Sequence, residues 1–461
     1  MAASNINGNH GAVVAAPEYD TSFAAQPADL DAVPGLLNDI AFLKGNYNLD
    51  LSANREARLY LLAKARSLVQ ALESPRETML KHCGAETASF FMISLGIDVG
   101  LFHYLAKDNA RPKKATEISK GLSFEVDGLR RILRHLAAMG HIIQTGNDEY
   151  KPNNFSKALT IPIVADGYPF YRSVCLPPMV NLHKWMKTKG YITPTTGKDN
   201  PFTFGNQTDM SMFEYMAAFP QFNQQFNHHM GGYRLGRPAW FDRSIYPVQQ
   251  NLMEGFNPKY GGGAFMIDIG GNLGHDLERF RQAFPDHPGR LILQDQDSVI
   301  ERVIPTLGTP ALHKSVELMG HNFFTPEPVK GARCYYLHHI LHDWPDDKCV
   351  DIVSHIKAAM QPGYSKLLVN EHIIPSMGAS WEATYLDLYM MTLFGARERT
   401  DEDWRNLLER QCGLKITNIY NPGNGVEGIV ECEVPIQNNM GGMGGQGQGL
   451  GQNGYATGSS S

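Results

Sequence analysis

The sequence predicts an α/β protein in which a doubly wound, mainly parallel sheet follows an all-helical N-terminal domain. From residue 257 onward, short apolar runs alternate with amphipathic helical patterns, as expected for parallel strands joined by helices. Between residues 36 and 140 the pattern is helical instead. Ligands of a doubly wound sheet bind at the carboxyl ends of its strands, so we searched for functional residues after each predicted strand.

Composition and charge limit the class of protein and its partners. The 461 residues are 43% hydrophobic and carry a net charge of −6, which argues against nucleic acid or an anionic membrane surface as the main partner. The six cysteines form no CxxC pair, and the N-terminus lacks the features of a secretory leader. No stretch approaches the ~18 apolar residues of a membrane span. We therefore expect a soluble, cytoplasmic protein.

Changes in character divide the chain into five segments. Residues 1–33 are predicted to be a disordered arm, and residues 436–461 a disordered tail rich in Gly, Gln and Asn. Residues 34–165 are predicted to form the helical domain. Residues 166–256 form an aromatic-rich helical connector, whose Phe, Tyr and Met side chains are either ordinary core or the lining of a pocket for a flat, apolar ligand. Residues 257–435 form the α/β domain.

Within the helical domain, a predicted helix is followed by a predicted hairpin. Leu129, Leu133 and Leu136 recur at the spacing of one helical face, and Gly140 stands where a C-terminal cap belongs. Residues 141–153 are predicted to form the hairpin. Helices followed by such a wing resemble a winged-helix module. The acidic net charge and the missing basic stripe favour a packing or dimerisation role over DNA binding.

The α/β domain is predicted to begin with a strand that runs into a glycine-rich turn. Glycines such as Gly270 and Gly271 at this place let the backbone approach a ligand and direct a helix N-terminus at it. Asp268, just before the turn, would repel phosphate and attract an ammonium group. Asp295 closes the next strand, where a carboxylate can accept both hydroxyls of a ribose. These residues predict an adenosine ligand without a pyrophosphate, such as S-adenosylmethionine (SAM).

The next predicted strand ends in YYLHHILHDWPDDKC, residues 335–349, which contains three histidines. The HxxxH spacing of His338 and His342 would direct both rings at one metal ion on a helix, but this segment is predicted to be a strand. No further ligand motif completes a site, so we predict no metal centre. We interpret His342 as a single catalytic base and His339 as a core or neighbouring residue; histidines with no chemical role are the alternative.

Five segments together resemble the plant and fungal class of SAM-dependent O-methyltransferases. The similarity covers residues 36–434, and the HDW and ERT segments, in this order and spacing, are specific to the family. The fungal branch that acts on aromatic polyketides, which includes the sterigmatocystin O-methyltransferases, is the most similar. The segments are FMIDIGGNLG, LILQDQDSVIE, YYLHHILHDWPDDKC, LLVNEHIIP and DLYMMTLFGARERTDEDWRNLL.

This resemblance implies a Rossmann-like catalytic domain, a winged-helix-like dimerisation domain, a homodimer, and methyl transfer from SAM to a phenolic hydroxyl of a small aromatic substrate. It implies that His342 is the general base and that Glu371 and Glu398 flank it. The residues predicted to bind the cofactor, from the turn and from the resemblance, are Gly270, Asp268, Gly271, Asp295, Asn322, Phe323 and His338. The residues predicted to contact the acceptor are Phe226, Met230 and Met391.

The chain departs from the family pattern at four places near the cofactor. Asn272 replaces a glycine, Asn322 replaces an acid and His338 replaces a Lys or Arg, while Gln296 and Asp297 replace the usual Leu-Pro. The side chain of Asn322 can still accept a hydrogen bond from the adenine amino group. We therefore expect weaker cofactor binding but not its loss.

The predicted chemistry is removal of a proton from a phenol, whose pKa is ~10 in water. A neutral imidazole at position 342 can take that proton, and the two glutamates can orient the ring and stabilise the imidazolium. Glu398 also has a competing interpretation, an ion pair with Arg397 or Arg399. Two rival functions remain open: a catalytically weak or silent SAM-binding scaffold that regulates a partner, and a winged-helix regulator that senses an aromatic ligand.

Overall fold

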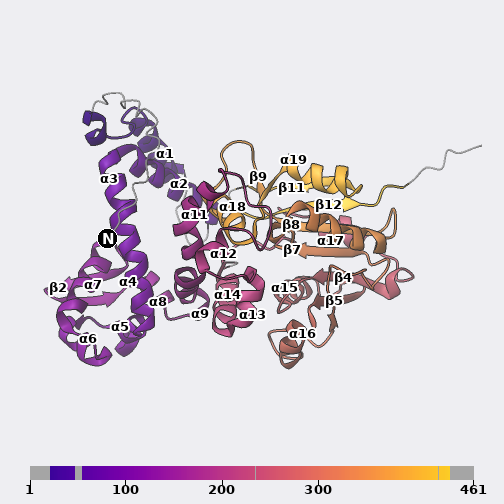
Figure 1. Ribbon diagram of the computed structural model, residues 1–461, viewed down its shortest axis with the longest axis horizontal. Helices are drawn as coiled ribbons and strands as arrows, with labels where there is room; N and C mark the ends of the chain where they lie inside the picture. Colours follow the sequence, from indigo (N-terminus) through magenta and orange to yellow (C-terminus); the bar gives the residue numbers. More distant parts are fainter. Residues whose placement is uncertain (1–20, 47–53, 234, 424, 437–461) are drawn as a thin grey trace, which may run out of the picture. The chain divides into compact units, whose positions relative to one another are not determined.

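The computed structural model describes residues 21–46, 54–233, 235–423 and 425–436, which form two compact units (Figure 1). Unit 1 comprises Met1–Ser173 and Gln221–Tyr233, and unit 2 comprises Val174–Pro220 and Arg234–Ser461. The predicted tail lies outside the described residues except at its first position, and so does the predicted arm up to residue 20.

Unit 1 is helical except for a small three-stranded sheet. Its short strands β1 (Lys113–Lys114), β3 (Glu149–Pro152) and β2 (Ile142–Gly146) pair antiparallel in that order. The helical elements are η1 (Thr21–Ala25), α1 (Val33–Asn46), α2 (Arg55–Leu72), α3 (Pro75–Leu80), η2 (Lys81–Glu86), α4 (Thr87–Asp98), α5 (Leu101–Ala110), α6 (Ala115–Leu122), α7 (Val126–Ala138), α8 (Asn154–Ala158), α9 (Pro162–Ala165), α10 (Gly167–Phe170), η3 (Tyr171–Cys175) and α14 (Pro220–Tyr233).

The core of unit 1 confirms the predicted helix and the hairpin after it. Leu129, Leu133 and Leu136 of α7 are buried and pack in one cluster with residues of α5. Burying each leucine stabilises the fold by roughly 1.5–3 kcal/mol. The backbone turns after α7 at Gly140, whose φ of +74° favours glycine, and strands β2 and β3 follow as the hairpin.

Among the described helices, none is by itself long and apolar enough to span a membrane. The bent pair Pro75–Asp98 and Leu101–Ala110 meets the criteria of length and composition when the two are taken together.

Unit 2 contains a seven-stranded sheet in the order β11-β12-β8-β7-β4-β5-β6. The five strands from β8 to β6 are parallel, and the hairpin of β11 and β12 adds two antiparallel strands at one edge. Their bounds are β4 (Ala264–Ile269), β5 (Arg290–Asp295), β6 (Val316–Gly320), β7 (Cys334–His338), β8 (Lys366–Glu371), β11 (Lys415–Tyr420) and β12 (Gly428–Glu433). The prediction of a doubly wound, mainly parallel sheet is confirmed.

Helices cover both faces of this sheet, as Figure 1 shows for α15 and α17. Helix α17 buries Ile352 and Ile356 on one face, and α15 buries Leu277 and Phe280 on the other. The remaining elements of unit 2 are α11 (Leu176–Thr188), α12 (Pro201–Asn206), α13 (Met212–Ala218), η4 (Gln249–Met253), η5 (Gly261–Gly263), α15 (His275–Ala283), α16 (Asp297–Val303), η6 (Ile304–Thr306), η7 (Leu341–Asp343), α17 (Asp346–Ala359), β9 (Ile373–Ile374), α18 (Trp381–Phe394), β10 (Arg399–Thr400), α19 (Asp401–Trp404) and η8 (Arg405–Gln411).

Candidate active site

His342 lies at the carboxyl end of the sheet, in the single helical turn η7 that follows β7. Its side chain is almost fully buried, and its Nδ1 lies 2.6 Å from Oε1 of Glu398. An ionised carboxylate can only accept, so Nδ1 carries the proton of this hydrogen bond. The other ring nitrogen, Nε2, is 3.6 Å from Oδ1 of Asp343. The imidazole is therefore held at one edge by a glutamate and has a second carboxylate beside its opposite edge.

Glu371 supports the backbone under this histidine. It ends β8, and its Oε1 accepts hydrogen bonds from the backbone N–H groups of Ile340, Leu341 and His342 at 3.2, 2.7 and 3.3 Å. Oxygens of Glu371 and Glu398 and a ring nitrogen of His342 all lie within 4.8 Å of one another. The three predicted residues thus come together, but Glu371 holds the turn that carries the histidine while Glu398 holds the ring.

The competing interpretation of Glu398, an ion pair with a neighbouring arginine, is wrong. Arg397 and Arg399 both bind Asp346, at 3.0 and 2.7 Å, and Glu398 binds His342. The backbone N–H of Glu398 donates to Oδ1 of Asp387 in α18, which fixes the carboxylate's place in the loop.

Arg399 explains why the ERT segment matters beyond its glutamate. Its guanidinium is fully buried and donates to the carbonyl oxygens of Leu341 and Trp344 as well as to Asp346. A buried arginine needs such partners, because a charge without them is costly in a low-dielectric interior. Arg399 therefore holds the turn that carries His342 through the carbonyl oxygens of Leu341 and Trp344, while Glu371 holds its backbone N–H groups.

The charges around His342 favour its protonated form. Burial lowers the pKa of the imidazole, but the carboxylates of Glu398, Asp343 and Glu371 outweigh it and raise the pKa to about 10. Burial raises the pKa of Asp343 to about 7, opposed by His342. Burial also raises the pKa of Glu398, which the pairing with His342 opposes. The surrounding carboxylates therefore make His342 a stronger base than an ordinary imidazole.

The glycine turn after β4 is shaped for close approach. Gly270 has a φ of +73°, and a Cβ added there would lie 2.6 Å from a side-chain carbon of Ile340. A Cβ on Gly271 would lie 2.5 Å from the carboxylate of Asp268, which is buried beneath the turn. Asn272, in place of a third glycine, adopts a φ of +50°, a conformation that asparagine tolerates. The departure at this position is therefore compatible with the turn.

Asp295 joins the glycine turn to the end of β5. Its Oδ2 accepts the backbone N–H of Asn272 at 2.9 Å, and its Oδ1 accepts that of Gln296 at 2.8 Å. Burial raises the pKa of Asp295, and these two hydrogen bonds oppose the rise. Each carboxylate oxygen keeps lone pairs for hydroxyl donors, so the acid remains suited to a ribose.

Asn322 and Phe323 follow β6, whose carboxyl end lies beside that of the parallel strand β5. The amide of Asn322 is exposed, and its Oδ1 accepts the backbone N–H of Phe324 at 3.0 Å. The ring of Phe323 is half-buried and lies 6.1 Å from that of Trp344, edge to face. The asparagine oxygen is thus already used in a turn.

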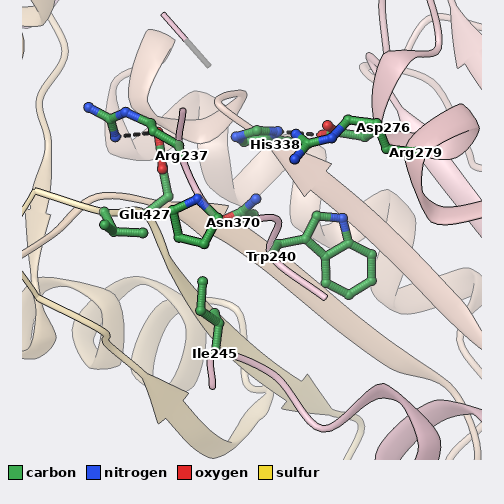
Figure 2. A pocket seen from close by; sticks show the side chains of 10 residues that line it. Arg237, Trp240, Ile245, Asp276, Arg279, His338, Asn370 and Glu427 are labelled. Carbon is green, nitrogen blue, oxygen red and sulfur yellow. Dashed lines mark hydrogen bonds and ion pairs between the residues drawn. The ribbon is translucent and has the colours of Figure 1, made fainter. Parts of the chain in front are cut away.

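His338 lines a pocket (Figure 2). Its Nδ1 lies 2.5 Å from Oδ2 of Asp276 at the start of α15, and its Nε2 has no hydrogen-bond partner among the described residues. Figure 2 shows Arg279 beside this pair. The lining residues are Arg237, Pro238, Trp240, Ile245, Asp276, Arg279, His338, Asn370, Val426 and Glu427.

Sequence reasoning found His338 but missed the rest of this pocket. Within the described chain, two more buried polar atoms of the lining lack partners besides Nε2 of His338, namely Nε1 of Trp240 and Oδ1 of Asn370. Arg279 is exposed and makes no ion pair with any described residue, whereas Arg237 binds Glu427 at 2.9 Å and Glu382 at 2.6 Å. These residues come from four separate segments, and no local motif marks them.

The predicted acceptor residues are distributed over both units. Phe226 and Met230 lie on α14 of unit 1, where the ring of Phe226 is 5.6 Å from that of Phe170. Met391 lies on α18 of unit 2, in the helix that leads to Glu398. In the aromatic-rich connector, Phe202 and Tyr246 are fully buried core residues, so much of that segment is ordinary packing.

Comparisons with known proteins identify the family. A model of the O-methyltransferase domain matches residues 193–413. O-methyltransferase mpaG of Penicillium brevicompactum is 33% identical over 413 residues, which cover 89% of this chain and 99% of the relative. The chain belongs to the O-methyltransferase family. Another member, demethylsterigmatocystin 6-O-methyltransferase of Aspergillus parasiticus, is 37% identical over 326 residues, or 70% of this chain and 80% of the relative.

Solved structures agree with the fold of this O-methyltransferase. The structure of LepI in complex with SAM is 27% identical, with a TM-score of 0.76 over 87% of this chain and 99% of that chain. The same values hold for a structure described as a pericyclic reaction enzyme. The predicted family and the predicted cofactor, SAM, are confirmed.

The electrostatics of the site predict that Glu398→Gln lowers the pKa of His342 from about 10 toward its ordinary value. Because the pKa is raised on folding, the ion pair stabilises the folded state fully below pH ~6.5, the unfolded value, and this stability is lost as the pH rises through about 10. Histidine ¹³Cε1 shifts, followed by NMR from pH 5 to 11, measure the change. The signal of His342 is assigned by its absence in His342→Gln.

Glu409→Gln, a change far from the imidazole in sequence and on η8, serves as the control and should leave this titration unchanged. If His342 of the wild type titrates with a midpoint near pH 6.5, the surrounding carboxylates do not raise its pKa as described.

Proposed function

We propose that this O-methyltransferase methylates a phenolic hydroxyl of a polycyclic, polyketide-type secondary metabolite, with His342 as the general base. The observation that supports it most is the buried 2.6 Å hydrogen bond between Nδ1 of His342 and Glu398, which keeps Nδ1 protonated and makes Nε2, once deprotonated, the acceptor of the phenol proton. The raised pKa of His342, about 10, makes that deprotonated ring a stronger base than an ordinary imidazole. An ordinary imidazole, with a pKa of ~6.5, would be a much weaker acceptor for such a proton.

Each residue of the site has a separate role in moving that proton. His342 takes it on Nε2, while Glu398 keeps the other ring nitrogen protonated and stabilises the imidazolium that forms. Glu371 fixes the turn through three backbone N–H groups. SAM, when bound, supplies an electrophilic methyl group on a sulfonium. Orientation of the acceptor oxygen by the buried base then contributes a large part of the acceleration.

The cofactor residues divide into a nucleoside end and an amino-acid end. Gly270, Gly271, Asp295 and Phe323 form the nucleoside end, with Asp268 beneath the turn. The pocket of Figure 2 is chemically complementary to the α-amino acid group of SAM. The guanidinium of Arg279 and the indole N–H of Trp240 suit a carboxylate, and the amide oxygen of Asn370 suits an ammonium group.

This division also accounts for His338 in place of a lysine or arginine. A permanent positive charge is present in the same pocket on Arg279, so position 338 need not supply it. The imidazole of His338 is oriented by Asp276 and offers Nε2 to the pocket. Asn322, whose amide stays exposed, is the candidate contact for the adenine edge.

The class of acceptor follows from relatives and from the predicted contacts. Relatives include a demethylsterigmatocystin 6-O-methyltransferase, whose name denotes methylation of a polycyclic aromatic. Met391 is the apolar side chain of unit 2 proposed to contact a flat ring system, and Phe226 and Met230 of unit 1 stay predictions. All six cysteines are free, which fits a reducing compartment, and we assign the reaction to the cytoplasm.

His342→Ala should lower kcat by about 10²- to 10⁴-fold, the usual contribution of a general base, and leave the dissociation constant of SAM within about twofold. Turnover is measured by mass spectrometry on a panel of hydroxyanthraquinones and hydroxyxanthones, and SAM binding by calorimetry. The difference in kcat between the wild type and His342→Ala should decrease as the pH approaches ~10, because phenols then ionise without a general base.

His287→Ala, a histidine in the turn before β5, is the matched control and should behave like the wild type. Full turnover by His342→Ala would refute the base. SAM binding by the wild type without turnover of any phenol would favour the silent scaffold instead.

Arg279→Ala should raise the dissociation constant of S-adenosylhomocysteine by about 10-fold or more, because a charged hydrogen bond contributes ~1.5–3 kcal/mol. The dissociation constant of 5′-methylthioadenosine, which lacks the amino-acid group, should change by no more than about twofold. Calorimetry with both ligands makes the comparison, and Arg410→Ala, an exposed arginine paired with Glu402, is the control. Equal losses for the two ligands would place the amino-acid end elsewhere.

The helical domain is proposed to make a homodimer. Helices α1 and α2 expose large apolar side chains, among them Phe42 at 66%, Leu37 at 51% and Leu72 at 47%. Such surfaces mark interaction sites. Light scattering after size-exclusion chromatography should give a molar mass twice the 51.2 kDa of one chain. The double variant Phe42→Glu, Leu72→Glu should give a lower molar mass. A monomeric wild type would overturn the dimer.

A further inference from the structure

His339 has an unusual backbone conformation directly after β7. Its φ is +53°, in the left-handed region that residues with a Cβ seldom adopt and that costs of order 1–3 kcal/mol. The conformation is held by a backbone hydrogen bond, in which the N–H of His339 donates to the carbonyl oxygen of Asn370 at 3.2 Å. The side chain is only 5% exposed. A strained residue buried beside a reactive group calls for a functional explanation.

The conformation places the ring of His339 flat against that of His342. The two ring centroids are 4.7 Å apart and the planes differ by 24°. The ring of His339 also lies 5.8 Å from that of His372, and their planes differ by 27°. A residue that simply continued β7 would point to the face opposite His338, and the left-handed φ of His339 breaks that alternation.

A stacked ring supplies a constraint that Glu398 cannot. The hydrogen bond that Nδ1 of His342 donates to Glu398 holds one edge of the ring. A flat ring against its face resists tilting of the imidazole out of its plane. The faces of Trp, Tyr and Phe attract cations by about 0.5–2 kcal/mol, and an uncharged imidazole face would act in the same sense on the imidazolium of His342.

We propose that His339 is a positioning residue for the general base, holding the His342 ring by stacking and stabilising its charged form. This inference rests on His342 being the base, as proposed above. The backbone strain at position 339 is then the structural cost of the orientation.

The charged and titratable groups around His339 come from four different segments of unit 2. They are His338 on β7, His342 on η7, His372 after β8, and Glu427 before β12. Burial lowers the pKa of His372 to about 4, so that ring is neutral. Glu427 lies 3.8 Å from Nε2 of His339 but is paired with an arginine at 2.9 Å.

The central variant is His339→Gly, because glycine accepts the left-handed backbone and deletes only the ring. It should unfold at the same or a higher urea concentration than the wild type. Its kcat should fall about 10- to 100-fold with KM for SAM and acceptor within about threefold, and the pKa of His342 should fall by about 0.5–1 unit.

His339→Phe should restore the function, because it keeps an uncharged ring and removes both nitrogens. Its kcat should lie within about threefold of the wild-type value. The pKa of His342 in this variant should lie within about 0.3 of the wild-type pKa. Gln207→Gly is the matched backbone control: Gln207 has a φ of +52° at the end of α12, and the change should alter neither kcat nor the titration. Should the glycine variant fold poorly, His339→Asn, which tolerates the same φ, replaces it.

Full kcat and an unshifted His342 titration in His339→Gly would overturn the proposal, and so would a phenylalanine variant as impaired as the glycine variant. His342→Ala is assayed in parallel. If that variant keeps its turnover, the proposed function fails. If it is inactive while His339→Gly is unimpaired, only the role of His339 fails. The NMR titration needs no acceptor, so it decides the matter even where the phenol panel contains no substrate.

Discussion

The structure of the site depends on one buried hydrogen bond, between Nδ1 of His342 and Oε1 of Glu398. A buried carboxylate is costly unless it is paired, and a buried imidazolium is costly for the same reason. Pairing them removes both penalties and leaves Nε2 as the reactive edge. Because Asp343 and Glu371 lie nearby, negative charge exceeds positive charge around the ring, and the histidine becomes far more basic than in water.

Several of the carboxylates around the turn accept hydrogen bonds from their own donors. Glu371 accepts three backbone N–H groups of the η7 turn, which orders the turn as well as satisfying the acid. Asp346, just beyond the HDW segment, is held by the two arginines that flank Glu398. The same contacts that neutralise the acids therefore fix the backbone on which His342 lies. Catalytic geometry and electrostatic balance have a single structural origin here.

The departures from the family pattern have local physical explanations. Asn272 occupies a left-handed position that asparagine tolerates, so the glycine turn keeps its shape without a third glycine. At position 338 the lost cation is replaced within the same pocket by an arginine of α15, while Asp276 orients the imidazole. A histidine at this position also starts the row of rings that continues through His339 to His342.

The sequence by itself determined the doubly wound sheet, the glycine turn and the position of His342 after β7. These follow from local patterns: alternation of apolar runs, glycines at a strand end, and a histidine in a specific segment. It also paired Glu371 and Glu398 with His342, but it could not separate the acid that binds the ring from the one that binds the turn. Only the tertiary structure decided that, together with the arginine partners and the stacked histidines. The pocket around Arg279, Trp240 and Asn370 was likewise decided by the fold, because its walls come from segments far apart in the chain and only the packing of the sheet brings them to one place.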